Sequence, residues 1–106
     1  MIFIRFLAEP DGALRGFEIS GHADHAPYGE DTVCAAVSSA AYLVANTITE
    51  ILKIPAEITV EQGTMIVQIA ASDAYACRDI LAGLKLHFTA LEEQYPACMQ
   101  VDYMEV

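Results

Sequence analysis

The chain has 106 residues, which is enough for one folded domain and too short for two, so we predict a single domain over residues 1–106. Its formal net charge of −10 disfavours direct binding to nucleic acid, because an acidic surface repels phosphate. Apolar residues make up 55% of the chain, above the usual share, and this excess predicts a buried interface between two copies in a homodimer.

Cysteine usage and apolar segments indicate where the protein works. The three cysteines, Cys34, Cys77 and Cys98, form no CxxC pair, so the sequence predicts neither a zinc knuckle nor a redox dithiol and favours a reducing cytoplasm. Residues 1–12 read as a strand and a turn, so we expect no signal peptide. Polar residues interrupt the most apolar stretch, 33–52, so we expect no membrane span.

The first third of the chain predicts a β-hairpin followed by a long loop. Residues 2–8 and 14–20 have strand-like composition and alternation, and Pro10–Gly12 between them is a turn. Residues 20–31 have no apolar period and contain several ionisable side chains. A loop of this length is uncommon in so small a domain and is often functional.

Thr32 opens the first predicted helix. Apolar residues recur from Val33 to Ile51 at three- and four-residue steps, which is the period of a helix with one buried face. Asp31 or Thr32 is the expected N-cap, since either side-chain oxygen can accept a free backbone N–H. Pro55 is expected to end the helix.

A second hairpin and a second helix follow. Residues 58–61 and 65–70 predict two strands joined by a turn near Gln62–Gly63. After them, Ser72 or Asp73 is the expected cap of the second helix, because short polar side chains are preferred at that position.

The apolar stripe of the second helix runs from Cys77 to Tyr95, and Pro96 is expected to end it. Residues 99–103 alternate enough to form a last strand. The element order ββαββαβ therefore predicts an α+β fold, a largely antiparallel sheet with two helices packed on one face.

Three features of residues 20–38 point to nucleophilic catalysis. Cys34 lies in the first turn of the predicted helix, where free N–H groups and the positive end of the dipole favour a thiolate. His22 lies across the loop and has a side chain suited to proton transfer near neutral pH. The amides of residues 33–35 are candidates for stabilising an oxyanion.

The acidic neighbours of Cys34 can act in either direction. Glu30 or Asp31, pointed at the sulfur, would raise the pKa of the Cys34 thiol. Asp31 can instead cap the helix or orient His22, and the sequence leaves these alternatives open. A further alternative is that Cys34 is only a small buried side chain, which is the common state of a lone cysteine in an apolar helix.

A metal site is the competing use of the same loop. His22, Asp24 and His25 together with Cys34 are potential ligands, but their spacing matches no standard metal motif, so we expect no metal and no other cofactor. Gly21 and Gly29 are either plain turn residues or hinges of a loop that opens for a substrate.

Cys77 and Cys98 are expected to be structural, since Cys77 falls on the apolar stripe of the second helix and Cys98 precedes the last strand. His87 lies between the stripe positions of that helix and is expected on the surface.

The string Gly21-His22-Ala23, then Gly29, then DTVCAAVS over residues 31–38, resembles the signature of the ribosomal-processing cysteine protease (Prp) family. The length and element order resemble that family over the whole domain. Thr32 is a departure, because an aliphatic residue is more usual there, and it concerns packing more than chemistry.

The resemblance implies a cytoplasmic bacterial endopeptidase that acts as a homodimer and removes a short N-terminal extension from a large-subunit ribosomal protein. It implies that Cys34 is the nucleophile and His22 the general base, and that Asp31 and Ser38 support them; Ser38 also lies four residues after Cys34 on the same helical face. The extension that the family removes ends in aromatic residues, which implies a hydrophobic groove.

Two alternatives to an endopeptidase remain open from the sequence. One is a non-enzymatic ribosome-associated module whose acidic surface holds a basic protein. The other is a cysteine thioesterase, which needs the same nucleophile but a small acyl substrate.

Overall fold

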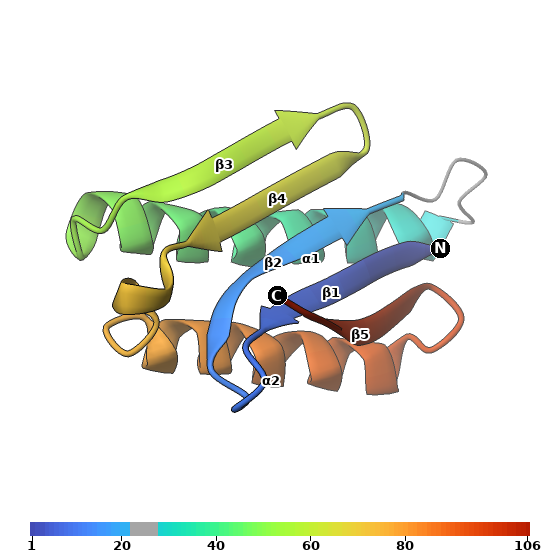
Figure 1. Ribbon diagram of the computed structural model, residues 1–106. Helices are drawn as coiled ribbons and strands as arrows, with labels where there is room; N and C mark the ends of the chain where they lie inside the picture. The colour runs from blue at the N-terminus through green and yellow to red at the C-terminus, as the bar shows by residue number, and fades with distance from the viewer. Residues whose placement is uncertain (22–27) are drawn as a thin grey trace.

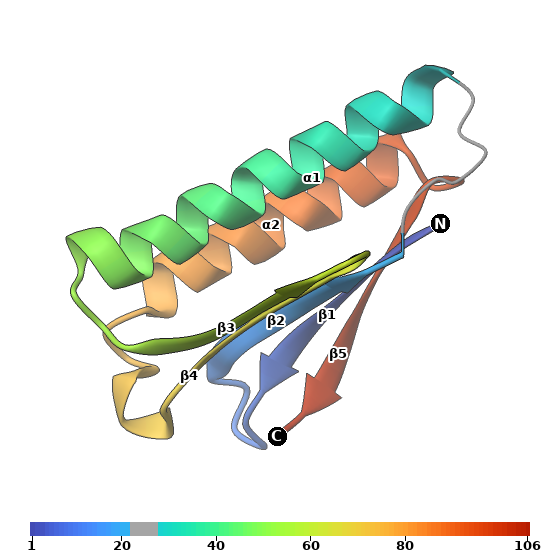
Figure 2. The same ribbon diagram turned by 90° about the horizontal axis from the view of Figure 1, so that it is seen from above.

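A computed structural model describes the backbone of residues 1–21 and 28–106 and the side chains of residues 1–21 and 32–106. Its described elements form two layers, a five-stranded sheet and a pair of helices that cover one face of it (Figures 1 and 2). The prediction of an α+β fold with the order ββαββαβ is confirmed.

The sheet has the strand order β3-β4-β2-β1-β5. Neighbouring strands are antiparallel except β1 and β5, which run parallel. The strands are β1 (Ile2–Ala8), β2 (Leu14–Ser20), β3 (Ala56–Glu61), β4 (Thr64–Ile69) and β5 (Met99–Glu105). The predicted strands therefore stand within two residues of those observed, because alternation and turn residues mark them clearly.

The two long helices are α1 (Tyr28–Asn46) and α2 (Arg78–Gln94). A π-helical segment, η1 (Thr47–Ile51), extends α1, and a 3₁₀ turn, η2 (Ala71–Asp73), precedes α2. Both helices end before a proline, as predicted from Pro55 and Pro96.

The widened turn at the end of α1 has a local cause. The hydroxyls of Thr47 and Thr49 donate to the carbonyls of Leu43 and Ala45, one turn back. Such side-chain bonds compete with the backbone ladder and bend helices. The amide of Leu52 then donates to the carbonyl of Thr47, five residues back, at 2.8 Å.

Both predicted helix starts were wrong. The first was expected at Thr32, but α1 begins at Tyr28, because Glu30 and Asp31 suit the positive end of a helix and the apolar period starts one turn after the helix does. The second was expected after a cap at Ser72 or Asp73. Those two residues form the 3₁₀ turn η2 instead, and α2 starts after Cys77, whose side chain makes no capping hydrogen bond.

The core lies between the sheet and the helices. Phe6 of β1 is at its centre, with its ring 6.5 Å from that of Phe17 on β2 and 6.2 Å from that of Phe88 on α2, measured between centroids. The helices contribute the apolar stripes predicted from the sequence, including the fully buried Ile48 and Leu81. Tilted contacts between aromatic rings stabilise a core by more than the burial of their apolar area alone.

The segment Thr32–Ile51 is also long and apolar enough to span a membrane by length and composition, with a mean hydropathy of 1.3. In this fold several of its apolar residues, Val37, Ala41 and Val44, are buried in the core between the helices and the sheet. The opposite face of the same helix exposes Leu43, so α1 is apolar on more than its buried side.

Candidate active site

Cys34 lies near the end of the second turn of α1, and residues of the β3–β4 hairpin line the same pocket as its side chain. Its side chain is half-buried: part of it packs against the core, and part lines a pocket of about 300 Å³. A pocket of this size is at the lower end of the range for small-molecule and peptide-side-chain sites. The thiol of Cys34 is therefore reachable from solvent, unlike a core cysteine.

Three groups of residues line this pocket, which we call the Cys34 pocket. The first comes from one face of α1, the second from the start of β1 and the end of β2, and the third from the β3–β4 hairpin. They are Cys34, Val37, Ser38 and Tyr42; Ile2, Ile19 and Gly21; and Val60, Glu61, Gly63, Thr64 and Met65.

The start of α1 at Tyr28 changes the chemistry expected for Cys34. Only the first four N–H groups of a helix are free of intrahelical bonds, and because α1 starts at Tyr28 all of them precede residue 32. The prediction that the amides of residues 33–35 hold an oxyanion is therefore wrong, as is the placing of Cys34 in the first turn. The favourable effect of the helix dipole is likewise concentrated in that first turn.

The structure brings part of the predicted site together. Ser38, one turn after Cys34, is exposed and lines the same pocket, and so does Gly21. Asp31 and Gly29 have their backbones in the first turn of α1. His22, the predicted general base, lies outside the described residues, but it directly follows Gly21 in the chain.

Gly21 has a conformation that few other residues adopt. Its φ is +79°, and a Cβ placed on it would lie 2.5 Å from the carbonyl oxygen of Met1. Its amide donates to the carbonyl of Gly63 at 3.0 Å, which ties the end of β2 to the tip of the β3–β4 hairpin. A side chain at this position would strain the pocket wall immediately before His22.

The other candidates lie elsewhere. Cys77 is fully buried, and burial, with a smaller contribution from the charge of Asp73, raises the pKa of its thiol. His87 is exposed on α2 and lies outside the Cys34 pocket, as predicted for a surface residue. Within residues 1–21 and 32–106 no group of three potential metal ligands lies close together, while His22, Asp24 and His25 of the alternative metal site lie outside the described residues.

Tyr42, Val60 and Met65 are pocket residues that the sequence did not single out. Tyr42 had a detectable signal, because it continues the four-residue spacing of Cys34 and Ser38 along one helical face. Val60 and Met65 had none, since their place in the pocket depends on the hairpin reaching under α1.

Comparison with known proteins agrees with this fold. A substrate-peptide complex of the Staphylococcus aureus ribosomal processing protease Prp matches with a TM-score of 0.88 and 23% identity, covering 98% of this chain and all of that one. A complex of the same protease with a covalently linked product peptide matches with a TM-score of 0.85 and 24% identity, again covering 98% of this chain and all of that one. The Streptococcus mutans protein SMU.848 matches with a TM-score of 0.88 and 24% identity over 100% of this chain and 96% of its own.

These likenesses, all below 25% identity, show a shared fold. Among curated proteins none matches the chain. The family model for the cysteine protease Prp matches residues 1–100, almost the whole sequence. The chain therefore belongs to the cysteine protease Prp family.

Proposed function

We propose that this protein is a processing endopeptidase that removes an N-terminal extension from a large-subunit ribosomal protein. The observation that carries the proposal is the half-buried thiol of Cys34 in the wall of a mainly apolar pocket, in a chain of the Prp family. A protease of the same fold has been crystallised with a substrate peptide and with a covalently linked product peptide, which supports a peptide as the substrate here.

In the proposed reaction, His22 takes the proton of the Cys34 thiol and the sulfur attacks the scissile carbonyl. The C–N bond breaks, His22 returns the proton to the leaving amine, and an acyl group stays on the sulfur. Water, deprotonated by His22, then breaks the S–C bond and releases the acid product. Asp31, Ser38, Gly21 and Gly29 are proposed to support these two residues.

We further propose that the protein acts in the cytoplasm as a homodimer without binding nucleic acid directly. The charge of −10 supports a basic protein substrate over a nucleic acid. The homodimer is supported by an apolar groove of about 220 Å³ on the outer side of the helix layer, away from the Cys34 pocket. Residues of both helices line it, among them Leu43 of α1 and Ile80 of α2.

Mass analysis of an extended ribosomal protein incubated with the enzyme tests the proposal. The wild-type protein should release the extension, and Cys34→Ala should lose about 10⁴-fold or more in kcat, since the nucleophile is gone. Cys98→Ala is the matched control, because Cys98 is also half-buried but does not line the Cys34 pocket. Full cleavage by Cys34→Ala would refute the proposal.

A further inference from the structure

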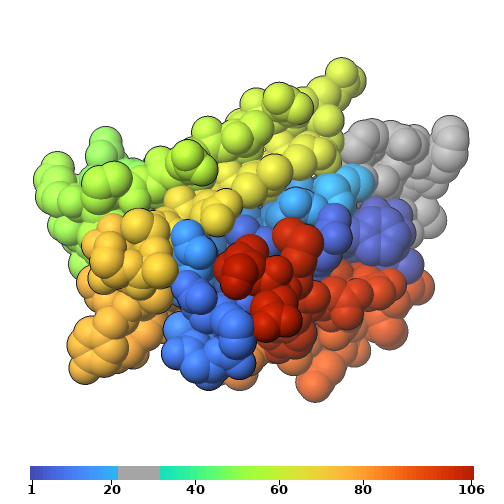
Figure 3. Space-filling model, viewed as in Figure 1, coloured from blue at the N-terminus to red at the C-terminus, as the bar shows by residue number. Residues whose placement is uncertain are grey.

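Strand β3 forms one edge of the sheet, and nothing in the described part of the chain covers it. Residues 57–61 are all exposed, although they lie in a regular strand paired with β4. Figure 3 shows the β3–β4 hairpin along the margin of the molecule, in yellow-green, with its outer side open. An uncovered edge presents unpaired backbone groups to which another strand can bind.

The unpaired groups can be assigned from the register. A Cβ on Gly16 of β2 would overlap the carbonyl oxygen of Val67, so Val67 directs its backbone groups toward β2. Ile58 is the partner of Val67 on β3, so its N–H and C=O point away from β4. Because the pattern repeats every second residue, the backbone groups of Val60 point outward as well.

The side chains of Ile58 and Val60 lie on the helix side of the sheet, since their partners Val67 and Met65 are buried there. The helix layer leaves both side chains partly uncovered, and they are 43% and 54% exposed. Val60 also lines the Cys34 pocket, as does Tyr42 on α1. The exposed apolar strip on β3 is thus continuous with the pocket that contains the thiol.

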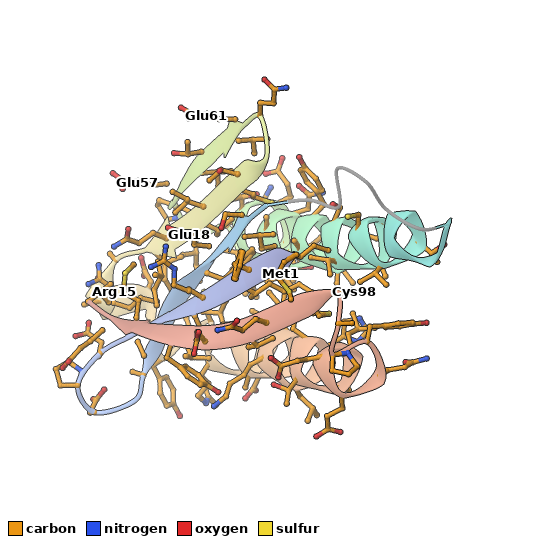
Figure 4. The ribbon with its side chains drawn as sticks, turned by 90° about the vertical axis from the view of Figure 1, so that its right-hand side faces the viewer. Met1, Arg15, Glu18, Glu57, Glu61 and Cys98 are labelled. Atoms are coloured by element: carbon orange, nitrogen blue, oxygen red, sulfur yellow. The ribbon has the colours of Figure 1, made fainter. Side chains whose placement is uncertain are left out.

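On the opposite side of the same strand are Glu57 and Glu61. Figure 4 shows both side chains directed away from the helices. Neither forms an ion pair with a described residue. Their charges, and the net charge of −10, disfavour pairing of this edge with a second copy of the chain and favour a partner with basic residues.

We propose that the substrate binds as a sixth strand along β3. The occupant is an extended peptide segment whose alternate apolar side chains lie beside Ile58 and Val60, with polar or basic side chains between them beside Glu57 and Glu61. Backbone hydrogen bonds to the free groups of Ile58 and Val60 hold the segment, and Val60 leads it into the Cys34 pocket. The inference rests on the proposed peptidase function, whose substrate it describes.

Amide hydrogen exchange of the Cys34→Ala protein, with and without a ten-residue substrate peptide, tests the docking without cleavage. The amides of Ile58 and Val60 should exchange at least tenfold more slowly with peptide, while those of Glu57 and Thr59, already bonded to β4, should change little. Unchanged exchange at Ile58 and Val60 in saturating peptide would overturn the inference. So would protection without peptide that rises with protein concentration, because a second copy would then occupy the edge.

A backbone scan of the peptide gives a second measure, with wild-type cleavage and Cys34→Ala binding read in parallel. On one side of the scissile bond, N-methylation of every second peptide amide should weaken both cleavage by the wild type and binding by Cys34→Ala. If the peptide is cleaved but N-methylation shows no alternating effect, the docking on β3 is refuted and the proposed peptidase function is not. If the effect of N-methylation on binding alternates but the wild type does not cleave the unmodified peptide, the docking is supported and the proposed peptidase function is refuted.

A charge test completes the design. Glu57→Gln, at a position outside the Cys34 pocket, should raise KM about two- to fivefold for a peptide with lysine at the intervening positions, and should leave KM unchanged for its glutamine analogue. Glu105→Gln, an exposed carboxylate on the other edge strand β5, is the matched control and should raise neither KM. Equal effects of the Glu57 and Glu105 substitutions would count against specific docking on β3.

Discussion

The cysteines of this chain occupy very different surroundings. Cys34 is half-buried and borders the Cys34 pocket, whereas Cys77 is fully buried beside Asp73 at the start of α2. A thiol alkylates through its thiolate and needs access to the reagent. At neutral pH, Cys34 should therefore react with iodoacetamide well before Cys77, and peptide mapping after brief labelling measures the order.

Cys77 also makes the stability of the fold depend on pH. Burial raises the pKa of its thiol above the usual 9.0, so the folded protein keeps a proton that the unfolded chain releases. The contribution of Cys77 to stability is then full below that value and is lost as the pH rises through the folded pKa. Between pH 8 and pH 10 the free energy of unfolding should fall, as measured by urea denaturation.

The matched variant is Cys77→Ala. It should be less stable than the wild type at pH 7, by about 1–2 kcal/mol, because a buried atom is removed from a packed site. Its stability should decline less between pH 8 and pH 10 than that of the wild type. Identical pH profiles for the two proteins would show that Cys77 does not control this dependence.

At the scale of elements, the sequence predicted what depends on local periodicity. Alternation at Ile2–Ala8 and Leu14–Ser20 located both strands of the first hairpin, and the apolar stripe of α2 is buried as expected. The start of the first helix was less predictable because the apolar period begins only at Val33, more than one turn after α1 starts at Tyr28. Ser72 and Asp73 suit a cap and a 3₁₀ turn equally well.

The candidate site was predictable only where its residues share one helix face. Cys34 and Ser38 follow from that spacing and from the family motif. Val60 lies 26 positions further along the chain and enters the pocket only through the pairing of β3 with β4, which one sequence does not specify. Its partner Met65 lines the pocket for the same reason.

The bulge between β1 and β2 makes a glycine necessary. The register shifts between Leu7 and Ala8, and Gly16 opposite has a φ of +150°. Gly16→Ala should lower the free energy of unfolding by about 3 kcal/mol or more, because the new Cβ would overlap the carbonyl oxygen of Val67. Gly12→Ala is the control: Gly12 also has positive φ but open space around it, so about 1–2 kcal/mol is expected. Equal losses in urea denaturation would contradict the steric account.

For the whole molecule, the groove between α1 and α2 determines what we expect of its assembly. Leu43 lines this groove and is 66% exposed, whereas Leu86 is 73% exposed but lies outside it. If two copies pack through the groove, Leu43→Glu should convert the dimer to an 11.5 kDa monomer, because the charge would be buried at the interface. Leu86→Glu should leave the dimer intact.

Light scattering coupled to size-exclusion chromatography measures the mass of each variant. A dimer that survives Leu43→Glu and dissociates with Leu86→Glu would assign the interface to another part of the helix layer. A wild-type protein that is monomeric at micromolar concentration would refute the homodimer itself.

The parallel pairing of β1 with β5 also determines at which terminus a tag or tether can be attached without blocking the Cys34 pocket. Ile2 lies at the pocket end of the sheet, while Glu105 pairs with Ala8 at the far end, so the two termini leave the molecule in opposite directions (Figures 1 and 2). An affinity tag or a surface tether joined after Val106 would leave the entrance to the thiol clear. The same addition before Met1 would emerge beside Gly21 and obstruct incoming peptides, so immobilised assays should use the carboxyl end.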